Sequence, residues 1–194
     1  MQSVKNKKIA ITGSIGCGKS FVSEIFRSHG LSVFDADAYN RTLYENEDIL
    51  KALYVAFPSV FVDGNVNKKA LASLIFNDST KKDILESIML PKIIEAIHQE
   101  MMKHSIFVAE VPTLFENHLE DEFDIIIVVA ADQSIILKRL EERGLSHEES
   151  LTILNQQVEQ GVKIEKADVV FYNNKSKQSL KEEVDKWVSE NLCI

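Results

Sequence analysis

Short apolar runs alternate along this chain with longer stretches of helical periodicity. The runs are Ile9–Ile11, Leu31–Phe34, Ile106–Val111, Ile125–Ala130 and Val169–Tyr172. A short run that is mostly apolar, with no polar residue at every second position, predicts a strand buried on both faces, which is typical of a parallel sheet. A helix is predicted between the first two runs, with its apolar positions on one face: Phe21, Val22, Ile25 and Phe26. The alternation predicts an α/β fold, with a five-stranded parallel sheet and helices on both of its faces.

Two segments interrupt the alternation. Residues 38–105 contain no convincing strand, and their helical periodicity is broken by Pro58, the Asp63–Gly64 turn and Pro91. They are expected to form a helical insertion after the second strand. Residues 134–167 are charged and helical and form a second insertion, after the fourth strand.

Polar residues predict where two of the later helices begin. Ser146 and Glu149 have the spacing of a capping box, and Ser179 and Glu182 have the same spacing at the start of the last helix. That last helix places four apolar residues on one face: Leu180, Val184, Trp187 and Val188. We expect one domain, residues 1–194, whose core is formed by about 1–37, 106–133 and 168–194.

Charge and composition narrow the possible classes of function. The formal net charge is −8, which argues against a protein that wraps nucleic acid or coats an anionic membrane. The longest apolar run, Ile125–Ala131, is much shorter than the roughly 18 residues that span a bilayer. Cys17 and Cys193 cannot build a disulfide framework or a zinc site by themselves. We therefore expect a cytoplasmic protein without nucleic-acid or membrane partners, either a monomer or a small homo-oligomer.

The strongest motif lies directly after the first predicted strand. Eight residues match the phosphate-loop pattern G-x-x-x-x-G-K-[ST]: Gly13, Ser14, Ile15, Gly16, Cys17, Gly18, Lys19 and Ser20. Glycines let successive backbone N–H groups face a phosphate, and the positive end of the following helix points at the same anion. Lys19 is expected to reach the β- and γ-phosphates and Ser20 to bind magnesium. Cys17 is either a small filler residue or an oxidation-sensitive thiol.

The remaining sequence selects among phosphate-loop proteins. The segment 174–177 lacks the aspartate of a guanine-binding motif, which argues against a GTPase, and the length argues against a motor or helicase. A small-molecule kinase remains, with a core, an acceptor-binding insertion and a mobile lid. Transfer to an alcohol needs a carboxylate near the attacking hydroxyl, and Asp35 and Asp37 follow the second strand. Either carboxylate could accept the proton or organise magnesium, or the pair could cap the following helix.

A third acidic position ends the third predicted strand. Glu110 stands where it could hold magnesium through water or make a structural hydrogen bond. Glu116, six residues later, is expected to cap a helix. The five histidines are scattered without metal-ligand spacing.

Taken together, these motifs resemble the dephospho-CoA kinase family. The resemblance rests on the phosphate loop, on Asp35-Ala36-Asp37 with Arg41, and on Val111-Pro112-Thr113-Leu114-Phe115-Glu116. It continues in order through Gln157, Ala167-Asp168 and Asn173. It implies a P-loop kinase fold and transfer of the ATP γ-phosphate, with Mg²⁺, to the ribose 3′-hydroxyl of dephospho-CoA.

The resemblance also implies roles for single residues. Asp37 would be the catalytic base and Asp35 would support it, while Arg41 and the insertion of residues 38–105 would hold the acceptor. Lys19 and, in the lid of residues 134–167, Arg143 would act on the ATP phosphates. Asn173 would lie near the adenine.

The chain departs from the family pattern at four positions. Leu90 stands where the family usually has histidine, Gln160 and Lys163 stand where arginines are frequent, and Lys175 replaces a common glycine. Two other functions stay open. One is a P-loop kinase for another small alcohol or nucleotide, and the other is a nucleotide-binding regulator that has lost transfer.

Overall fold

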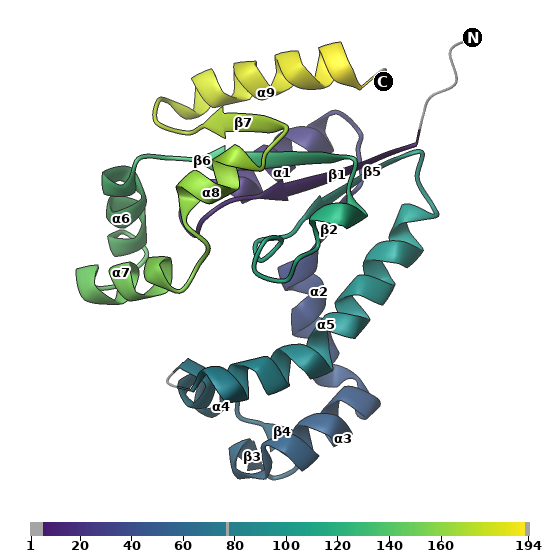
Figure 1. Cartoon of the computed structure of the whole chain (residues 1–194), viewed down its shortest axis with the longest axis vertical. Helices are drawn as coiled ribbons and strands as arrows, with labels where there is room; N and C mark the ends of the chain where they lie inside the picture. Colours follow the sequence, from purple (N-terminus) through teal and green to yellow (C-terminus); the bar gives the residue numbers. More distant parts are fainter. Residues whose placement is uncertain (1–5, 77, 193–194) are drawn as a thin grey trace. The chain divides into compact units, whose positions relative to one another are not determined.

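A computed structural model describes residues 6–76 and 78–192 of the chain (Figure 1). The chain divides into two compact units, the first made of Met1–Asp35 with Glu100–Ile194 and the second of Ala36–Gln99. Each unit has buried apolar residues of its own, gathered in a separate hydrophobic cluster.

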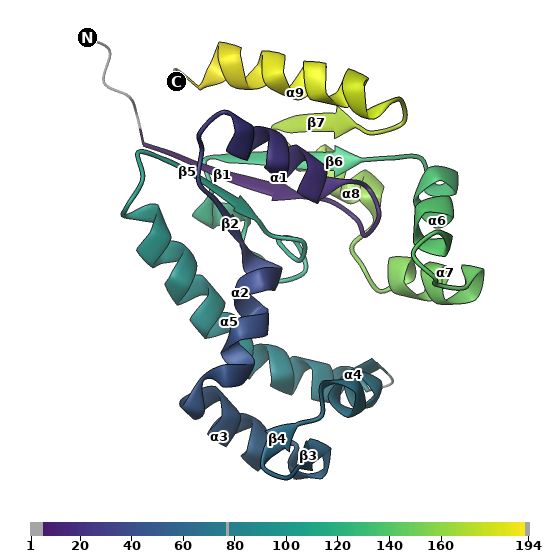
Figure 2. The same ribbon diagram turned by 180° about the vertical axis from the view of Figure 1, so that it is seen from behind.

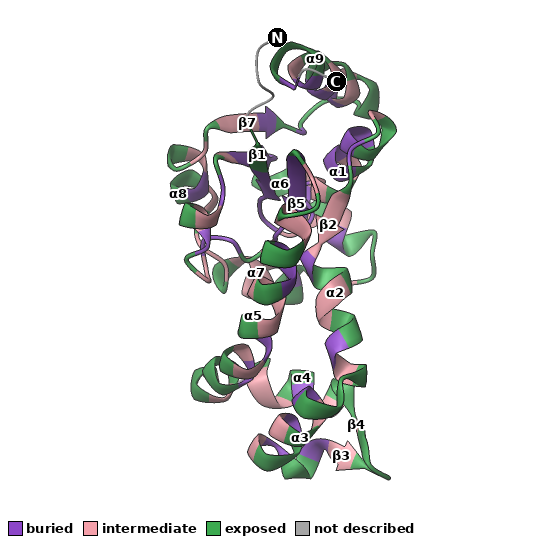
Figure 3. Ribbon diagram, turned by 90° about the vertical axis from the view of Figure 1, so that its right-hand side faces the viewer, coloured by how far each residue is buried: buried purple, intermediate pink, exposed green. Residues whose placement is uncertain are grey.

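The first unit is built on a five-stranded sheet whose strand order is β2-β5-β1-β6-β7, with every pair parallel. Its strands are β1 Lys7–Thr12, β2 Val33–Asp35, β5 Ile106–Glu110, β6 Ile125–Ala130 and β7 Val169–Tyr172. The predicted parallel sheet is confirmed, since each apolar run contains one of these strands. The central strands β1 and β5 are drawn in the buried colour along most of their length in Figure 3.

Helices cover both faces of this sheet, as predicted. The helices of this unit are α1 Lys19–Ser28, α6 Gln133–Glu141, α7 His147–Asn155, α8 Gln160–Glu165 and α9 Lys177–Asn191, with a 3₁₀ turn η3 at Glu120–Glu122. Of these, α6 and α7 lie beyond the strand ends and not over a face of the sheet (Figure 1). Helix α8 lies in front of the sheet in Figure 1, whereas α1 lies in front of it in the reverse view of Figure 2. No helix among the described residues has both the length and the apolar character needed to cross a membrane.

The two predicted helix starts have different outcomes. The capping box of α7 is confirmed, because Ser146 and Glu149 exchange side-chain and backbone hydrogen bonds. The last helix does start near Ser179, as predicted, but the predicted capping box of Ser179 and Glu182 is wrong. The helix begins at Lys177, and its N-cap is Ser176, whose hydroxyl accepts a hydrogen bond from the Ser179 N–H. Only Ser179 has a glutamate three residues later, but Ser176 has the extended backbone of an N-cap, φ −70° and ψ 155°, so the earlier serine caps the helix without a capping box.

Helices α1 and α9 pack together beside the sheet. The predicted apolar face of α9 is confirmed, since Leu180, Val184 and Val188 are buried. The ring centroids of Phe26 and Trp187 lie 6.0 Å apart. Because α1 follows the phosphate loop directly, this packing also holds the base of that loop.

The second unit is mostly helical. Its elements are α2 Ala36–Thr42, η1 Leu43–Glu45, α3 Glu47–Ala56, η2 Pro58–Val60, β3 Phe61–Val62, β4 Asn65–Val66, α4 Lys68–Phe76 and α5 Ser79–Met101, whose last two residues belong to the first unit. The expectation of no strand is wrong, because β3 and β4 form an antiparallel hairpin around the predicted turn. Asp63 and Gly64 both have positive φ, 49° and 79°, as a two-residue hairpin loop requires. Strands of two residues are too short to leave a period in the sequence.

The expected break at Pro91 is also wrong. Helix α5 runs through this proline, and Figure 1 shows a bend along its length. Proline removes one backbone N–H and kinks a helix without always ending it. Buried residues on both sides, Leu85 and Met89 before it and Ala96 after it, keep the two halves helical.

We predict that Phe26→Ala lowers the free energy of unfolding of the first unit by about 3–5 kcal/mol, because a fully buried ring is lost from the α1–α9 packing. Urea unfolding followed by far-UV circular dichroism and by the fluorescence of the single tryptophan, Trp187, measures the change. The control is Glu24→Ala on the exposed face of α1, which should unfold as the wild type does. Equal midpoints for both variants would contradict the packing role.

Candidate active site

The phosphate loop joins the end of β1 to the start of α1, and two of its glycines cannot be replaced without a clash. Gly13 and Gly18 have φ of 141° and 107°. A Cβ on Gly13 would lie 2.2 Å from the Val129 carbonyl oxygen, and one on Gly18 would lie 2.3 Å from Nδ2 of Asn173. The loop therefore packs directly against the backbone of β6 and against the side chain of Asn173, which follows β7, and this explains why the motif needs glycine at both positions.

Lys19 folds back over the loop that precedes it. Its Nζ donates hydrogen bonds to the carbonyl oxygens of Gly13 at 2.9 Å and Ser14 at 3.1 Å. The ammonium group is thus held at the N-terminal end of α1, where the positive end of the helix dipole adds to its charge. This corner concentrates positive potential in a chain of net negative charge, and it suits a phosphate chain.

Arg139 of α6 is a loop contact that the sequence reasoning missed. Its guanidinium donates to the carbonyl oxygens of Gly16 at 3.2 Å and Cys17 at 3.3 Å, and to that of Asn173 at 2.9 Å. No sequence signal pointed to Arg139: Ile136, three residues earlier on the same helix, packs close to Gly16, but that contact is itself seen only in the folded structure.

The structure brings together Ser20 and Glu110, two residues that the sequence named separately as candidates for holding magnesium. The Ser20 hydroxyl donates to Oε1 of Glu110 at 3.0 Å, and Glu110 is 5% exposed at the end of β5. Hydroxyl and carboxylate oxygens suit Mg²⁺, which keeps several waters and shares phosphate oxygens rather than needing a full protein cage. No group of three or more acidic, histidine or cysteine side chains converges as a metal site in residues 6–76 and 78–192. The pair therefore fits a magnesium ion that is bound together with a nucleotide.

Asn173 and Cys17 hold the far side of the loop. Nδ2 of Asn173 donates to the Cys17 carbonyl oxygen at 2.8 Å, and its backbone N–H donates to that of Ala130 at 2.7 Å. The Cys17 thiol is fully buried, and this burial raises its pKa above the usual value. The filler interpretation of Cys17 is confirmed, since a reactive thiol needs exposure and a lowered pKa. Cys193 lies outside the described residues.

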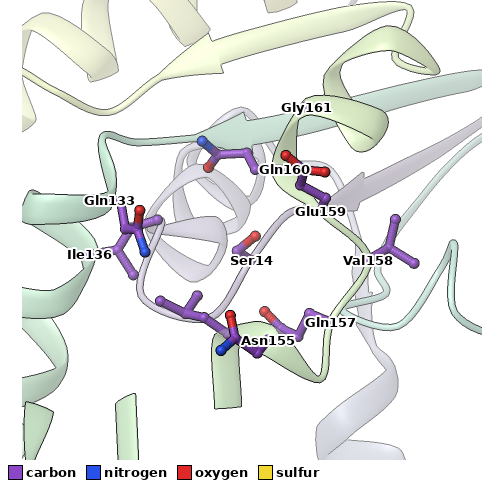
Figure 4. Close-up of a pocket in the computed structure, with 10 residues that line it drawn as sticks. Ser14, Gln133, Ile136, Asn155, Gln157, Val158, Glu159, Gln160 and Gly161 are labelled. Carbon is purple, nitrogen blue, oxygen red and sulfur yellow. The ribbon is translucent and has the colours of Figure 1, made fainter. Parts of the chain in front are cut away.

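A pocket of about 560 Å³ opens beside the loop (Figure 4). Ser14 lies between Gln133 and Ile136 of α6 on one side and residues 157–161 on the other (Figure 4). Its size is within the usual range for small-molecule sites. The side-chain oxygen of Gln157 accepts a hydrogen bond from the Ile15 N–H at 3.0 Å, so this wall is attached to the loop itself.

Two departures from the family pattern have structural partners here. The Gln160 amide exchanges hydrogen bonds with the N–H and carbonyl oxygen of Ala131, at 3.2 and 3.1 Å. Lys163 is buried, and its Nζ lies 2.8 Å from Oε1 of Glu116. The expectation that Glu116 caps a helix is wrong, because its carboxylate reaches across to Lys163 and to the Val158 N–H.

The remaining predicted residues lie on different elements. Asp35 ends β2, in register with Glu110 of β5. Asp37 and Arg41 lie four residues apart on α2 of the second unit, so they share one helix face, and both are exposed. Arg143 is exposed in the turn after α6, and among the described residues no hydrogen bond or ion pair reaches its guanidinium.

Comparisons with known proteins agree on one family. The model of the family described as dephospho-CoA kinase matches residues 7–179. A curated dephospho-CoA kinase of Bartonella quintana (strain Toulouse) is 34% identical over 194 residues, which cover 96% of this chain and 98% of that protein.

Solved structures extend the likeness to three dimensions. The crystal structure of TT1252 from Thermus thermophilus has a TM-score of 0.85 at 31% identity and covers 96% of this chain and 98% of that one. The dephospho-CoA kinase from Campylobacter jejuni has a TM-score of 0.70 at 30% identity, with 96% of both chains covered. Since the family model spans most of the chain and these relatives match it nearly end to end, the chain belongs to the dephospho-CoA kinase family.

Proposed function

We propose that this chain transfers the γ-phosphate of ATP to the ribose 3′-hydroxyl of dephospho-CoA and so performs the last step of coenzyme A synthesis. One observation carries the proposal: a complete phosphate loop, with its glycine geometry and its lysine in place, within a chain that matches this kinase family over residues 7–179. The departures from the family pattern at Gln160 and Lys163 do not oppose this proposal. Both side chains have structural partners, Ala131 and Glu116, and neither partner is Lys19 of the phosphate loop.

Binding of the ATP phosphates is proposed to use positive charge that is already fixed in position before the reaction. The loop N–H groups, the N-terminal end of α1 and Lys19 lie together, so negative charge that develops on the transferred group meets fixed positive charge. Arg143, in the proposed lid of residues 134–167, adds a second cation over the phosphates. Asn173 contributes near the adenine through the segment after β7.

Magnesium is proposed to bind between Ser20 and Glu110. Bound there, the ion would neutralise phosphate charge. In the protein itself, Glu110 accepts the hydrogen bond of the Ser20 hydroxyl and so holds that oxygen in place at the start of α1.

Activation of the acceptor hydroxyl is proposed to use the carboxylates of Asp35 and Asp37, at the end of β2 and just after it. Asp37 accepts the proton of the 3′-hydroxyl, the oxygen forms a new bond to the γ-phosphorus, and the bond from that phosphorus to the β–γ bridging oxygen breaks to release ADP. Asp35 supports this group from the end of the strand. Arg41, with the second unit, binds the acceptor, and its planar fork suits the acceptor's phosphates. We place the enzyme in the cytoplasm, as a monomer or a small homo-oligomer.

The proposed activity is tested by ADP release from Mg-ATP with and without dephospho-CoA, alongside adenosine, AMP and shikimate as other acceptors. We expect ADP only with dephospho-CoA, and coenzyme A as the product identified by mass spectrometry. ADP with another acceptor would mean a different kinase specificity. ATP binding without phosphate transfer to any of these acceptors would instead support a nucleotide-binding regulator that has lost kinase activity.

We predict that Asp37→Asn lowers kcat by about 10²–10⁴-fold and leaves the Kd for ATP unchanged, because the proton acceptor is lost and the phosphate loop is not. Steady-state kinetics and isothermal titration calorimetry measure the two quantities. Asp83→Asn, the same change at an exposed position of α5, is the control. Full turnover by Asp37→Asn would remove Asp37 from the mechanism.

We predict that Gly18→Ala raises the Kd for Mg-ATP by at least about tenfold, equivalent to about 1.4 kcal/mol, because the new methyl group pushes against Asn173 and distorts the loop. Gly30→Ala is the control, since Gly30 also has positive φ, 80°, but has nothing within 4 Å of an added Cβ. That control should cost about 1–2 kcal/mol of stability in urea and leave the Kd unchanged. Similar losses of ATP affinity in both variants would show that backbone strain, not the contact with Asn173, is responsible.

A further inference from the structure

A buried ion pair joins two segments that lie 47 residues apart in the first unit. The Nζ of Lys163 on α8 lies 2.8 Å from Oε1 of Glu116, with the Lys163 side chain fully buried and that of Glu116 15% exposed. Charges removed from water are costly, and a pair of this kind persists only where each partner neutralises the other. Loss of either partner therefore leaves a buried charge without compensation.

The same carboxylate oxygen also holds backbone. Oε1 of Glu116 accepts a hydrogen bond from the Val158 N–H at 3.0 Å. Val158 belongs to residues 157–161, which form one wall of the pocket beside the phosphate loop (Figure 4). Glu116 thus holds this wall at Val158. Through its ion pair with Lys163, it also holds α8, the helix that begins within the wall.

The pocket wall has two further attachments, both between neutral groups. Gln157 accepts from the Ile15 N–H of the phosphate loop, and Gln160 pairs with the backbone of Ala131 after β6. Hydrogen bonds that involve ionised groups are about twice as strong as neutral ones. The contact with Glu116 is therefore the strongest attachment of residues 157–161 among those that the structure describes.

The ion pair uses only one side of the carboxylate. Within the described residues, Oε2 of Glu116 is buried and has no hydrogen-bond partner. A lysine ammonium is a point charge and engages one oxygen here, whereas an arginine fork can donate to both oxygens of a carboxylate. The site should therefore accept arginine at position 163 without losing the attachment.

We propose that Glu116 and Lys163 are positioning residues for the nucleotide, although neither lines the pocket. Their ion pair holds residues 157–161 against the phosphate loop, so the affinity for ATP depends on a pair that ATP does not touch. This inference rests on the proposed function, since it takes the pocket as part of the ATP site.

The test measures ATP binding in variants of the pair. We expect Lys163→Met and Glu116→Gln to raise the Kd for Mg-ATP, and the KM for ATP, by about tenfold or more, within the range that displaced positioning groups produce. The KM for dephospho-CoA should change less than about twofold, because the acceptor groups lie elsewhere. Lys163→Arg should bind ATP within about threefold of the wild type, because the fork restores the charge and reaches Oε2.

The matched control is Lys166→Met. Lys166 follows α8 directly and pairs with Glu120 at 2.9 Å, but this pair is partly exposed and neither residue lines the pocket. Exposed pairs contribute little, so this variant should match the wild type in ATP affinity.

A purely structural role predicts a different pattern. Lower stability, with a smaller active fraction and an unchanged KM for ATP, would overturn the proposal, as would unchanged Kd values in both single variants. If Lys163→Met does not fold, Glu116→Gln, which keeps the side-chain size, decides alone. A wild-type chain that binds ATP but makes no coenzyme A would reject the proposed acceptor, while the Kd series would still decide this inference.

Discussion

The backbone carbonyls of the phosphate loop impose the constraint on which the first unit depends. A loop whose glycines adopt positive φ makes no regular ladder, so its buried carbonyl groups need donors from elsewhere. Lys19 supplies them for the first turn of the loop, and Arg139 with Asn173 supplies them for the part before α1. The loop is thereby tied to its own helix, to α6 and to the segment after β7.

The same requirement explains how an acidic chain can serve a polyanionic substrate. With a formal net charge of −8, the protein offers no general attraction to phosphate. Positive charge is instead placed at one corner of the sheet, where Lys19 and Arg139 are held by backbone oxygens. Cations fixed in this way need not reorganise when negative charge develops, which is how preorganised sites lower a barrier. The buried pair of Glu116 and Lys163 is neutral as a whole, so it contributes attachment of the neighbouring backbone at Val158 and not positive charge.

Prediction from sequence succeeded where the relevant forces act between neighbours in the chain. Apolar runs predicted all five strands of the large sheet, and the phosphate loop was predicted from its glycines and its lysine. It failed at Pro91 and at the hairpin around Gly64, where packing and very short strands override local patterns. In the candidate site, Ser20 was predicted as a magnesium ligand and Glu110 as a magnesium holder or a structural hydrogen-bond partner, but the hydrogen bond between the two was not predicted.

The sequence alone therefore determined the fold class and the phosphate loop, because glycine sterics and apolar periodicity are local properties that survive without coordinates. The family followed from a resemblance, carried by the phosphate loop and by the motifs at residues 35–37 and 111–116. Only the tertiary structure decided which polar side chains hold the loop and the pocket wall. Arg139, Gln157 and Lys163 reach partners between 34 and 142 residues away. No spacing rule encodes such contacts, since they form only when the completed sheet brings α6, α8 and the loop to one edge. The partners of these buried polar groups are a property of the assembled fold.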